Sequence, residues 1–165
     1  MRRLVRTLLA TAAVLLLPAA AQAHLVNTGL GPFYDGVSHF ALTPEDLLPA
    51  LALALLAGQQ GARAARLALF ALPAGWLAGG LAGLALSHGD SAVSLTTASF
   101  IALGGMVAAE VRIRPEWLAG GATALGLVHG YLNGAAMSQA KLGALGIAGI
   151  VFALFVAVAL AAAQV

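Results

Sequence analysis

The chain has 165 residues, of which 61% are hydrophobic and 8% are charged, and its formal net charge is +2. A soluble domain carries roughly 25% charged residues, so this composition excludes an ordinary soluble domain and indicates a single-domain integral membrane protein. There is no cysteine, which excludes disulfides, thiolate metal sites and iron–sulfur clusters.

Residues 1–23 have the pattern of a secretory signal peptide. Basic residues precede an apolar run of about ten residues, and Ala21-Gln22-Ala23 matches the small-x-small cleavage rule. Cleavage would make His24 the first residue of the mature chain, and an uncleaved anchor helix is the alternative. Because the arginines of this segment would leave with it, the basic balance does not indicate nucleic-acid binding.

Residues 24–43 are polar, aromatic and glycine-bearing, and we expect them to form an extracytoplasmic segment lying on or dipping into the membrane face. A helix start follows: Thr43 can cap, Pro44 suits the first helical position, and Asp46 stands where a capping-box acid would. Residues 44–165 are predicted to form an all-α membrane bundle of about five spans. The expected spans are 47–57, 65–86, 92–111, 117–137 and 142–163.

Basic residues indicate the orientation of the bundle. Arg63 and Arg66 follow the first span, Arg112 and Arg114 follow the third, and the other loops carry only Lys141. The positive-inside rule places the arginine-bearing loops in the cytoplasm. The mature N-terminus is then outside and the C-terminus is cytoplasmic.

Glycine recurs every four residues in the second and fourth spans. The two ladders are Gly75, Gly79 and Gly83, and Gly126, Gly130 and Gly134. This spacing puts small residues on one face of each helix and predicts close helix–helix packing.

Histidines and carboxylates gather on the predicted outer side of this apolar chain. They are His24, Asp35, His39, Glu45, Asp46, His88 and Asp90. Such groups are costly in a membrane bundle and indicate function, and nitrogen and oxygen donors without thiolates suit a divalent metal ion. Deeper in the fourth span, His129 and Asn133 lie one turn apart, where an imidazole and an amide could form a transit site.

A structural interpretation stays open for these residues. Glu45 and Asp46 could simply compensate a helix N-terminus, with His39 as an interfacial polar residue. His129 and Asn133 could form only an interhelical hydrogen bond, worth about 0.6–2 kcal/mol. Purely local roles are also open for His24, His88 and Asp90.

Several of these residues together form a family-like pattern. A histidine directly follows the expected cleavage site, Gly36 precedes His39 by three residues, an acidic helix start follows, and a late His-Gly pair lies in the fourth span. In this layout the chain resembles the HupE/UreJ family of small membrane proteins, which are associated with nickel or cobalt uptake for hydrogenase and urease. The resemblance covers most of the mature chain.

The chain departs from both family motifs. The motif His-Pro-x-x-Gly-x-Asp-His is matched at its first position by His39, and its other named positions are held by Phe40, Thr43, Glu45 and Asp46. The motif His-Gly-x-Ala-His-Gly-x-Glu is matched by His129-Gly130 and Gly134, and its other named positions are held by Leu132, Asn133 and Ala136. Oxygen donors in place of imidazoles lower the expected preference for nickel.

The resemblance implies His39, Glu45, Asp46 and His129 as ligands, with Asn133 as a weaker one. The expected function is uptake of nickel or cobalt across the bacterial inner (cytoplasmic) membrane, with the ion as transported ligand and no permanent cofactor. The alternative is a non-transporting metal-binding or accessory subunit of a larger membrane complex. Besides the lipid bilayer, a second copy of the chain or accessory subunits are expected partners. No nucleophile–base constellation is present, so we do not expect an enzyme.

Overall fold

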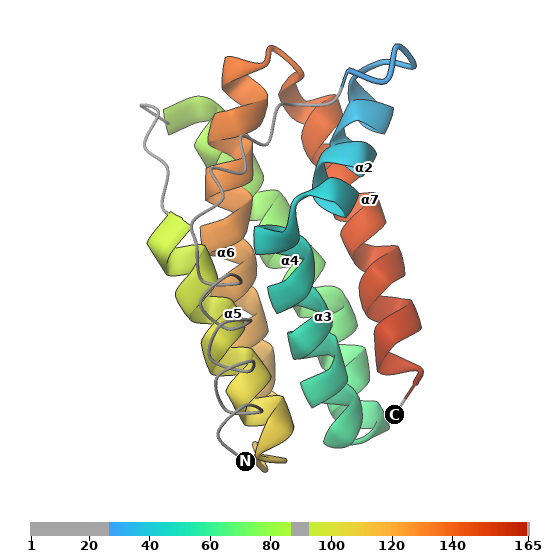
Figure 1. The fold of residues 1–165 in the computed structure, drawn as a ribbon, viewed down its shortest axis with the longest axis vertical. Helices are drawn as coiled ribbons and strands as arrows, with labels where there is room; N and C mark the ends of the chain where they lie inside the picture. The colour runs from blue at the N-terminus through green and yellow to red at the C-terminus, as the bar shows by residue number, and fades with distance from the viewer. Residues whose placement is uncertain (1–26, 87–92, 165) are drawn as a thin grey trace, which may run out of the picture.

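The computed structural model describes residues 27–86 and 93–164. These residues form six helices and no strand, which confirms the predicted all-α class. The helices are α2 (Pro32–Leu42), α3 (Pro44–Gln59), α4 (Ala62–Leu86), α5 (Val93–Ala108), α6 (Pro115–Gln139) and α7 (Gly143–Ala162). Figure 1 shows α3 to α7 running along one common direction, with α3 between α5 and α7.

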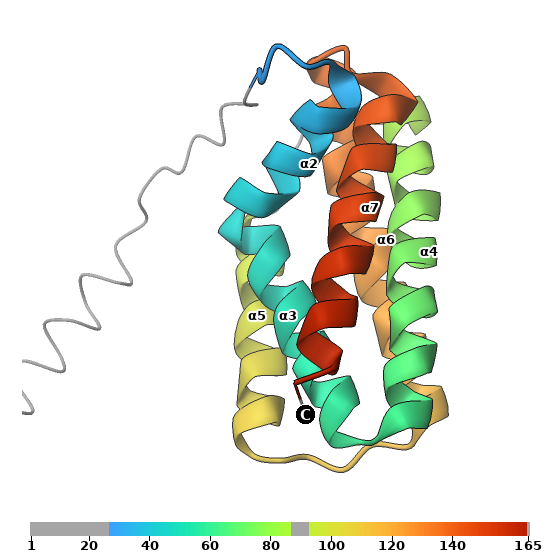
Figure 2. The ribbon, with the colours of Figure 1, turned by 90° about the vertical axis from the view of Figure 1, so that its right-hand side faces the viewer.

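Helices α2 and α3 are the two parts of one interrupted helical segment. They meet at Thr43 with a bend of 72°, and together they are long and apolar enough to count as one membrane span. Pro44 begins α3, because its fixed backbone angle and missing N–H suit the first helical position. Residues 32–42 are therefore helical and lie alongside α7, a feature that the sequence pattern of 24–43 did not predict (Figure 2).

Glycines allow the backbones of α2 and α7 to pack in direct contact. A Cβ atom on Gly36 would meet the carbonyl oxygen of Gly146, and a Cβ atom on Gly149 would meet that of Phe33. These backbones touch because no side chain separates them, which holds the short α2 within the bundle.

The predicted role of Asp46 as a capping-box acid is wrong. The helix begins where expected, with Thr43 at the N-cap, but neither Thr43 nor any other side chain makes a cap hydrogen bond there. The Asp46 side chain instead points into the bundle and bonds to α6. The first N–H groups of the helix therefore lack the side-chain acceptor that the sequence suggested.

The predicted glycine packing of the second and fourth spans is confirmed. α4 and α6 form the largest helix–helix contact in the described bundle. A Cβ atom on Gly79 would collide with the carbonyl of Leu127, and one on Gly130 would collide with that of Trp76. The ladders thus face one another, and the two backbones pack directly.

A count of about five membrane spans is not confirmed. Among the described helices, α4 and α7 are long and apolar enough to cross a membrane, and the bent pair α2–α3 would make a third span. α5 is apolar but has only 16 residues. α6 has 25 residues, and its polar side chains and glycines make it less apolar.

The arginine-bearing turns lie at the same end of the bundle, as the loop pattern predicted. The α3–α4 turn and the α5–α6 loop are both at the lower end in Figure 2. Arg63 and Glu116 form an ion pair of 2.8 Å there, joining the first turns of α4 and α6. Both side chains are more than half exposed, so the pair contributes at most about 1 kcal/mol.

Candidate functional site

Asp46 is a buried carboxylate at the break between α2 and α3. Only 4% of its surface is exposed. Its Oδ1 atom accepts a hydrogen bond from His129 Nδ1 at 2.8 Å, and its Oδ2 atom accepts one from Asn133 Nδ2 at 2.8 Å. A buried charge is stable only when it is paired and hydrogen-bonded, and both oxygens of Asp46 meet that condition.

His129 and Asn133 reach Asp46 because they are stacked one turn apart on α6. His129 is fully buried and Asn133 is 4% exposed. The second N–H of the Asn133 amide is used within the helix, where Nδ2 lies 2.9 Å from the His129 carbonyl oxygen. The other amide atom, Asn133 Oδ1, is buried and accepts no hydrogen bond from the described residues. An acceptor left unpaired in this way is costly, and it would gain from a cation or a donor.

Ser99 and Trp76 contact other parts of the His129 ring, through a hydrogen bond and a ring–ring contact. Ser99 Oγ lies 3.1 Å from His129 Nε2 and 2.7 Å from the Thr96 carbonyl oxygen. When its single proton is donated to that carbonyl, Ser99 can only accept from His129; when it turns to His129, the imidazole must be the acceptor. The indole of Trp76 lies against the imidazole, with ring centroids 5.2 Å apart.

His39, in the last turn of α2, lies next to this cluster. It is 7% exposed. Its ring interacts with the Asn133 side chain, and the carboxylates of Asp46 and Glu45 are close enough to act on it electrostatically. The bend at Thr43 is what turns His39 and Asp46, seven positions apart, toward the same side of α6.

The structure does not gather the other expected ligands at this cluster. Asp35 Oδ1 accepts hydrogen bonds from the Thr28 backbone N–H at 2.7 Å and from the Thr28 hydroxyl at 2.6 Å, so it closes the loop before α2. Glu45 is partly exposed. Among the described residues, no three His, Asp or Glu side chains are close enough to hold one metal ion together. Three expected ligands lie outside the described residues: His24, His88 and Asp90.

Sequence reasoning missed Ser99 and Trp76. Ser99 lies in an apolar helix beside other small hydroxyl residues, and nothing in the spacing singled it out. Trp76 offered a weak signal, because a bulky indole inside a glycine ladder needs a cavity or a partner ring. Its Nε1 atom is buried without a hydrogen-bond partner among the described residues.

Replacing Ser99 by alanine is expected to lower the unfolding free energy by about 1 kcal/mol, because His129 Nε2 loses its only described partner. Thermal unfolding of the purified protein in detergent measures this. Ser38→Ala is the matched control, since the Ser38 hydroxyl makes no hydrogen bond within the described part of the chain. Equal melting temperatures for the two variants would mean that the Ser99–His129 contact contributes nothing.

The comparisons with known proteins identify a family. The family model described as HupE / UreJ protein matches residues 12–165, nearly the whole chain. No curated protein and no solved structure matches. A membrane-type bundle with a buried His–carboxylate–Asn cluster fits a family associated with the handling of nickel and cobalt. The chain belongs to the HupE/UreJ family.

Proposed function

We propose that the protein is an uptake permease for nickel or cobalt ions and that Asp46 is the centre of its ion site. The observation that supports this most is a buried carboxylate beside an unpaired buried amide oxygen, at a break in a membrane helix. Ionisable groups inside membrane bundles mark ion pathways by default. Discontinuous helices place such groups at transport sites in many carriers.

Three donors are the proposed ligands of the ion. They are a ring nitrogen of His39, the Asp46 carboxylate and the Asn133 Oδ1 atom. To reach Asp46 Oδ2, the ion displaces the Asn133 N–H that now occupies it. Water completes the coordination, since the protein offers fewer than six donors here.

His129 is proposed to position Asp46. Its Nδ1–H donates to Asp46 Oδ1, and such partners of metal ligands commonly affect affinity by about 10–100-fold. This arrangement keeps one carboxylate oxygen fixed while the other exchanges an N–H donor for a metal ion. The predicted contributions of Glu45, His24, His88 and Asp90 would then be made earlier on the path, at the mouth. Asp35 is bonded to Thr28 and is not among the proposed ligands.

The orientation is also a proposal. The end that carries the arginines is placed in the cytoplasm by the positive-inside rule. His129 is 14 residues into α6, which puts the cluster about 21 Å from that end. The ion would therefore meet the cluster from the opposite, outer end before it passes the inner half of the bundle.

Uptake of radioactive nickel and cobalt by cells that express the chain tests the path. His39→Ala is expected to reduce uptake at least tenfold, because a ligand is lost. His129→Ala is expected to reduce it about 10–100-fold, and His129→Asn is expected to recover part of that loss, since an amide N–H can replace Nδ1–H. Wild-type uptake by both alanine variants would show that the path is wrong.

Transport and accessory roles separate in a purified system. The chain alone in liposomes should bring nickel or cobalt into the lumen, and its affinity in detergent should depend on the same residues. Binding without any lumenal accumulation would favour the accessory-subunit function. If the chain neither binds the metal nor accumulates it in the lumen, both the permease and the accessory-subunit functions are excluded.

A further inference from the structure

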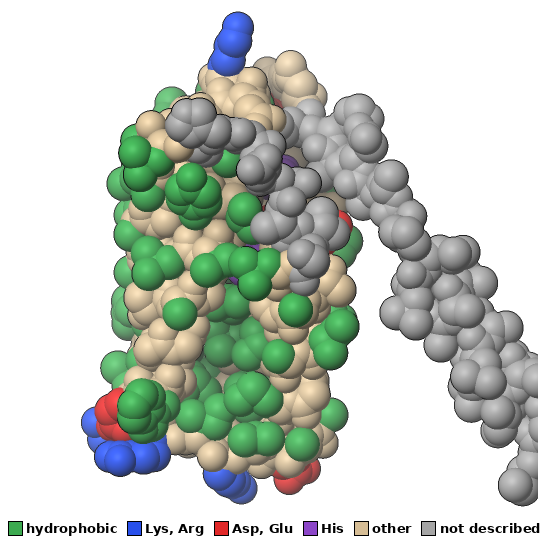
Figure 3. Space-filling view, turned by 90° about the vertical axis from the view of Figure 1, so that its left-hand side faces the viewer, with side chains coloured by type: hydrophobic (Ala, Val, Ile, Leu, Met, Phe, Trp, Pro, Cys, Tyr) green, Lys and Arg blue, Asp and Glu red, His purple; other side chains and the backbone are tan. Residues whose placement is uncertain are grey.

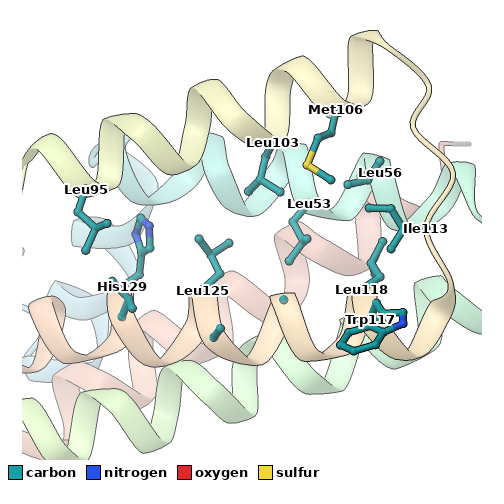
Figure 4. Close-up of a pocket in the computed structure, with 13 residues that line it drawn as sticks. Leu53, Leu56, Leu95, Leu103, Met106, Ile113, Trp117, Leu118, Leu125 and His129 are labelled. Carbon is teal, nitrogen blue, oxygen red and sulfur yellow. The ribbon is translucent and has the colours of Figure 1, made fainter.

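An apolar crevice of about 380 Å³ separates α5 from α6, with α3 behind it. α5 packs mainly against α3, so its other side is left facing this space. Leucine side chains from all three helices point into the crevice, which runs from Trp117 at one end to His129 at the other (Figure 4). In the space-filling view, hydrophobic side chains line a hollow on this face, and basic side chains lie below it (Figure 3).

The crevice is as long as one membrane leaflet. Trp117 and His129 are 12 residues apart on α6, which corresponds to about 18 Å of helix. The hydrocarbon core of a bilayer is about 30 Å thick, so one leaflet is about 15 Å. Trp117 is 74% exposed at the arginine-bearing end of the crevice, and tryptophan favours the membrane–water interface.

Two arginines are close in sequence to the open end. Arg112 and Arg114 are the neighbours of Ile113, which lines the crevice, and Arg112 also lines a second pocket together with Glu110. Both are exposed, and their contacts are long: Arg112 Nη1 lies 3.5 Å from the Gln59 carbonyl oxygen. Arg114 Nε lies 3.9 Å from Glu116 Oε2, and the Arg114 side chain is 80% exposed. Both guanidinium groups can therefore donate to a phosphate.

We propose that this crevice binds one anionic phospholipid, with an acyl chain between α5 and α6 and the phosphate on Arg112 and Arg114. Among the side chains of the lining, only His129 and the Trp117 indole N–H at the two ends can form hydrogen bonds, so an inserted peptide segment would leave most of its polar groups unpaired. A further α-helix is about 10 Å across, so a helix lying along the crevice would need far more space than about 380 Å³. A hydrocarbon chain with an anionic headgroup matches both the apolar wall and the basic mouth.

The bound lipid would restrict the movement of α5 relative to the ion site. His129 lines the end of the crevice that is remote from the arginines, and its ring contacts Ser99 on α5. Filling the space between α5 and α6 limits the movement of Ser99 away from His129. The proposal itself concerns lipid binding and holds whether or not the chain transports a metal.

Native mass spectrometry of the purified protein, with phosphatidylglycerol and phosphatidylcholine of identical acyl chains, measures the headgroup preference. We expect one phosphatidylglycerol to be retained about 30-fold more tightly, the factor that two basic residues at about 1 kcal/mol each provide. The double substitution Arg112→Gln and Arg114→Gln should abolish the preference, and Arg66→Gln, an exposed arginine at the same end, should keep it. Equal retention of the two lipids by the wild type would overturn the proposal.

A matched pair of glycine variants tests the acyl-chain position. Gly120 and Gly121 are neighbours on α6, and a Cβ atom at either meets nothing within 4 Å, but only Gly121 lines the crevice. Gly121→Leu should reduce phosphatidylglycerol retention at least tenfold, while Gly120→Leu should leave it unchanged, with helicity by circular dichroism equal in both. Equal retention by the two variants, or a dimer mass with no lipid, would overturn the proposal.

Discussion

Asp46→Asn is expected to reduce nickel and cobalt uptake at least 100-fold while leaving the protein folded in the membrane. The substitution keeps the shape of the side chain and one hydrogen-bond acceptor, but removes the negative charge between His39, His129 and Asn133. An amide oxygen is a much weaker partner than a carboxylate for a divalent ion in a buried site of low dielectric constant. The loss therefore exceeds the factor of about 10–100 that follows from removing a residue that only positions a ligand.

Asp35→Asn is the matched control for this experiment. Asp35 is 5% exposed, almost the same as Asp46, and it undergoes the same chemical change. Its oxygen accepts hydrogen bonds from Thr28, and an asparagine carbonyl can accept both. Uptake by Asp35→Asn should stay within a factor of about two, because the hydrogen bonds of the loop are kept. Equal uptake by wild type and Asp46→Asn, at equal protein amounts in the membrane, would remove Asp46 from the proposed site.

Gly130→Ala is expected to lower the unfolding free energy by about 1–3 kcal/mol, the usual cost of overpacking a core. The added methyl group would collide with the Trp76 carbonyl on α4, and a helix backbone cannot turn aside as a side chain can. Separating α4 from α6 also moves His129 away from the Trp76 ring that lies against it. Metal uptake should fall together with stability.

Gly120→Ala provides the comparison on the same helix. A Cβ atom at Gly120 meets nothing within 4 Å, so alanine there adds no clash. Replacing a helical glycine by alanine at such a position raises stability by about 0.4–1 kcal/mol. Melting temperatures of both variants in detergent should thus move in opposite directions. A Gly130→Ala protein as stable as Gly120→Ala would mean that the helices can separate at no cost.

Local sequence patterns determined most of the architecture. Apolar runs located the helices that begin near residues 62, 93, 115 and 143, and the glycine spacing identified the faces on which α4 and α6 meet. Thr43-Pro44 located the break, because proline suits the first position of a helix. These signals act within a few turns of chain, so they can be read without knowing the packing.

The residues of the candidate site were predicted in part from the sequence. His39, Asp46, His129 and Asn133 were all candidate residues before the structure, and the structure brings them to one cluster. A capping role was also predicted for Asp46, however, and the sequence offered no reason to choose Ser99 or Trp76. Asp35 was grouped with the ligands by residue type alone, and the structure pairs it with Thr28.

The sequence by itself determined that this protein is an α-helical membrane protein, and it predicted most of the candidate ligands at one end of the bundle. Only the tertiary structure decided which of those residues meet. Asp46 bonds to side chains 83 and 87 positions further along the chain, and no periodicity extends over that distance. Those partners are set by how close α3 and α6 lie and by the 72° turn at Thr43, which are properties of packing.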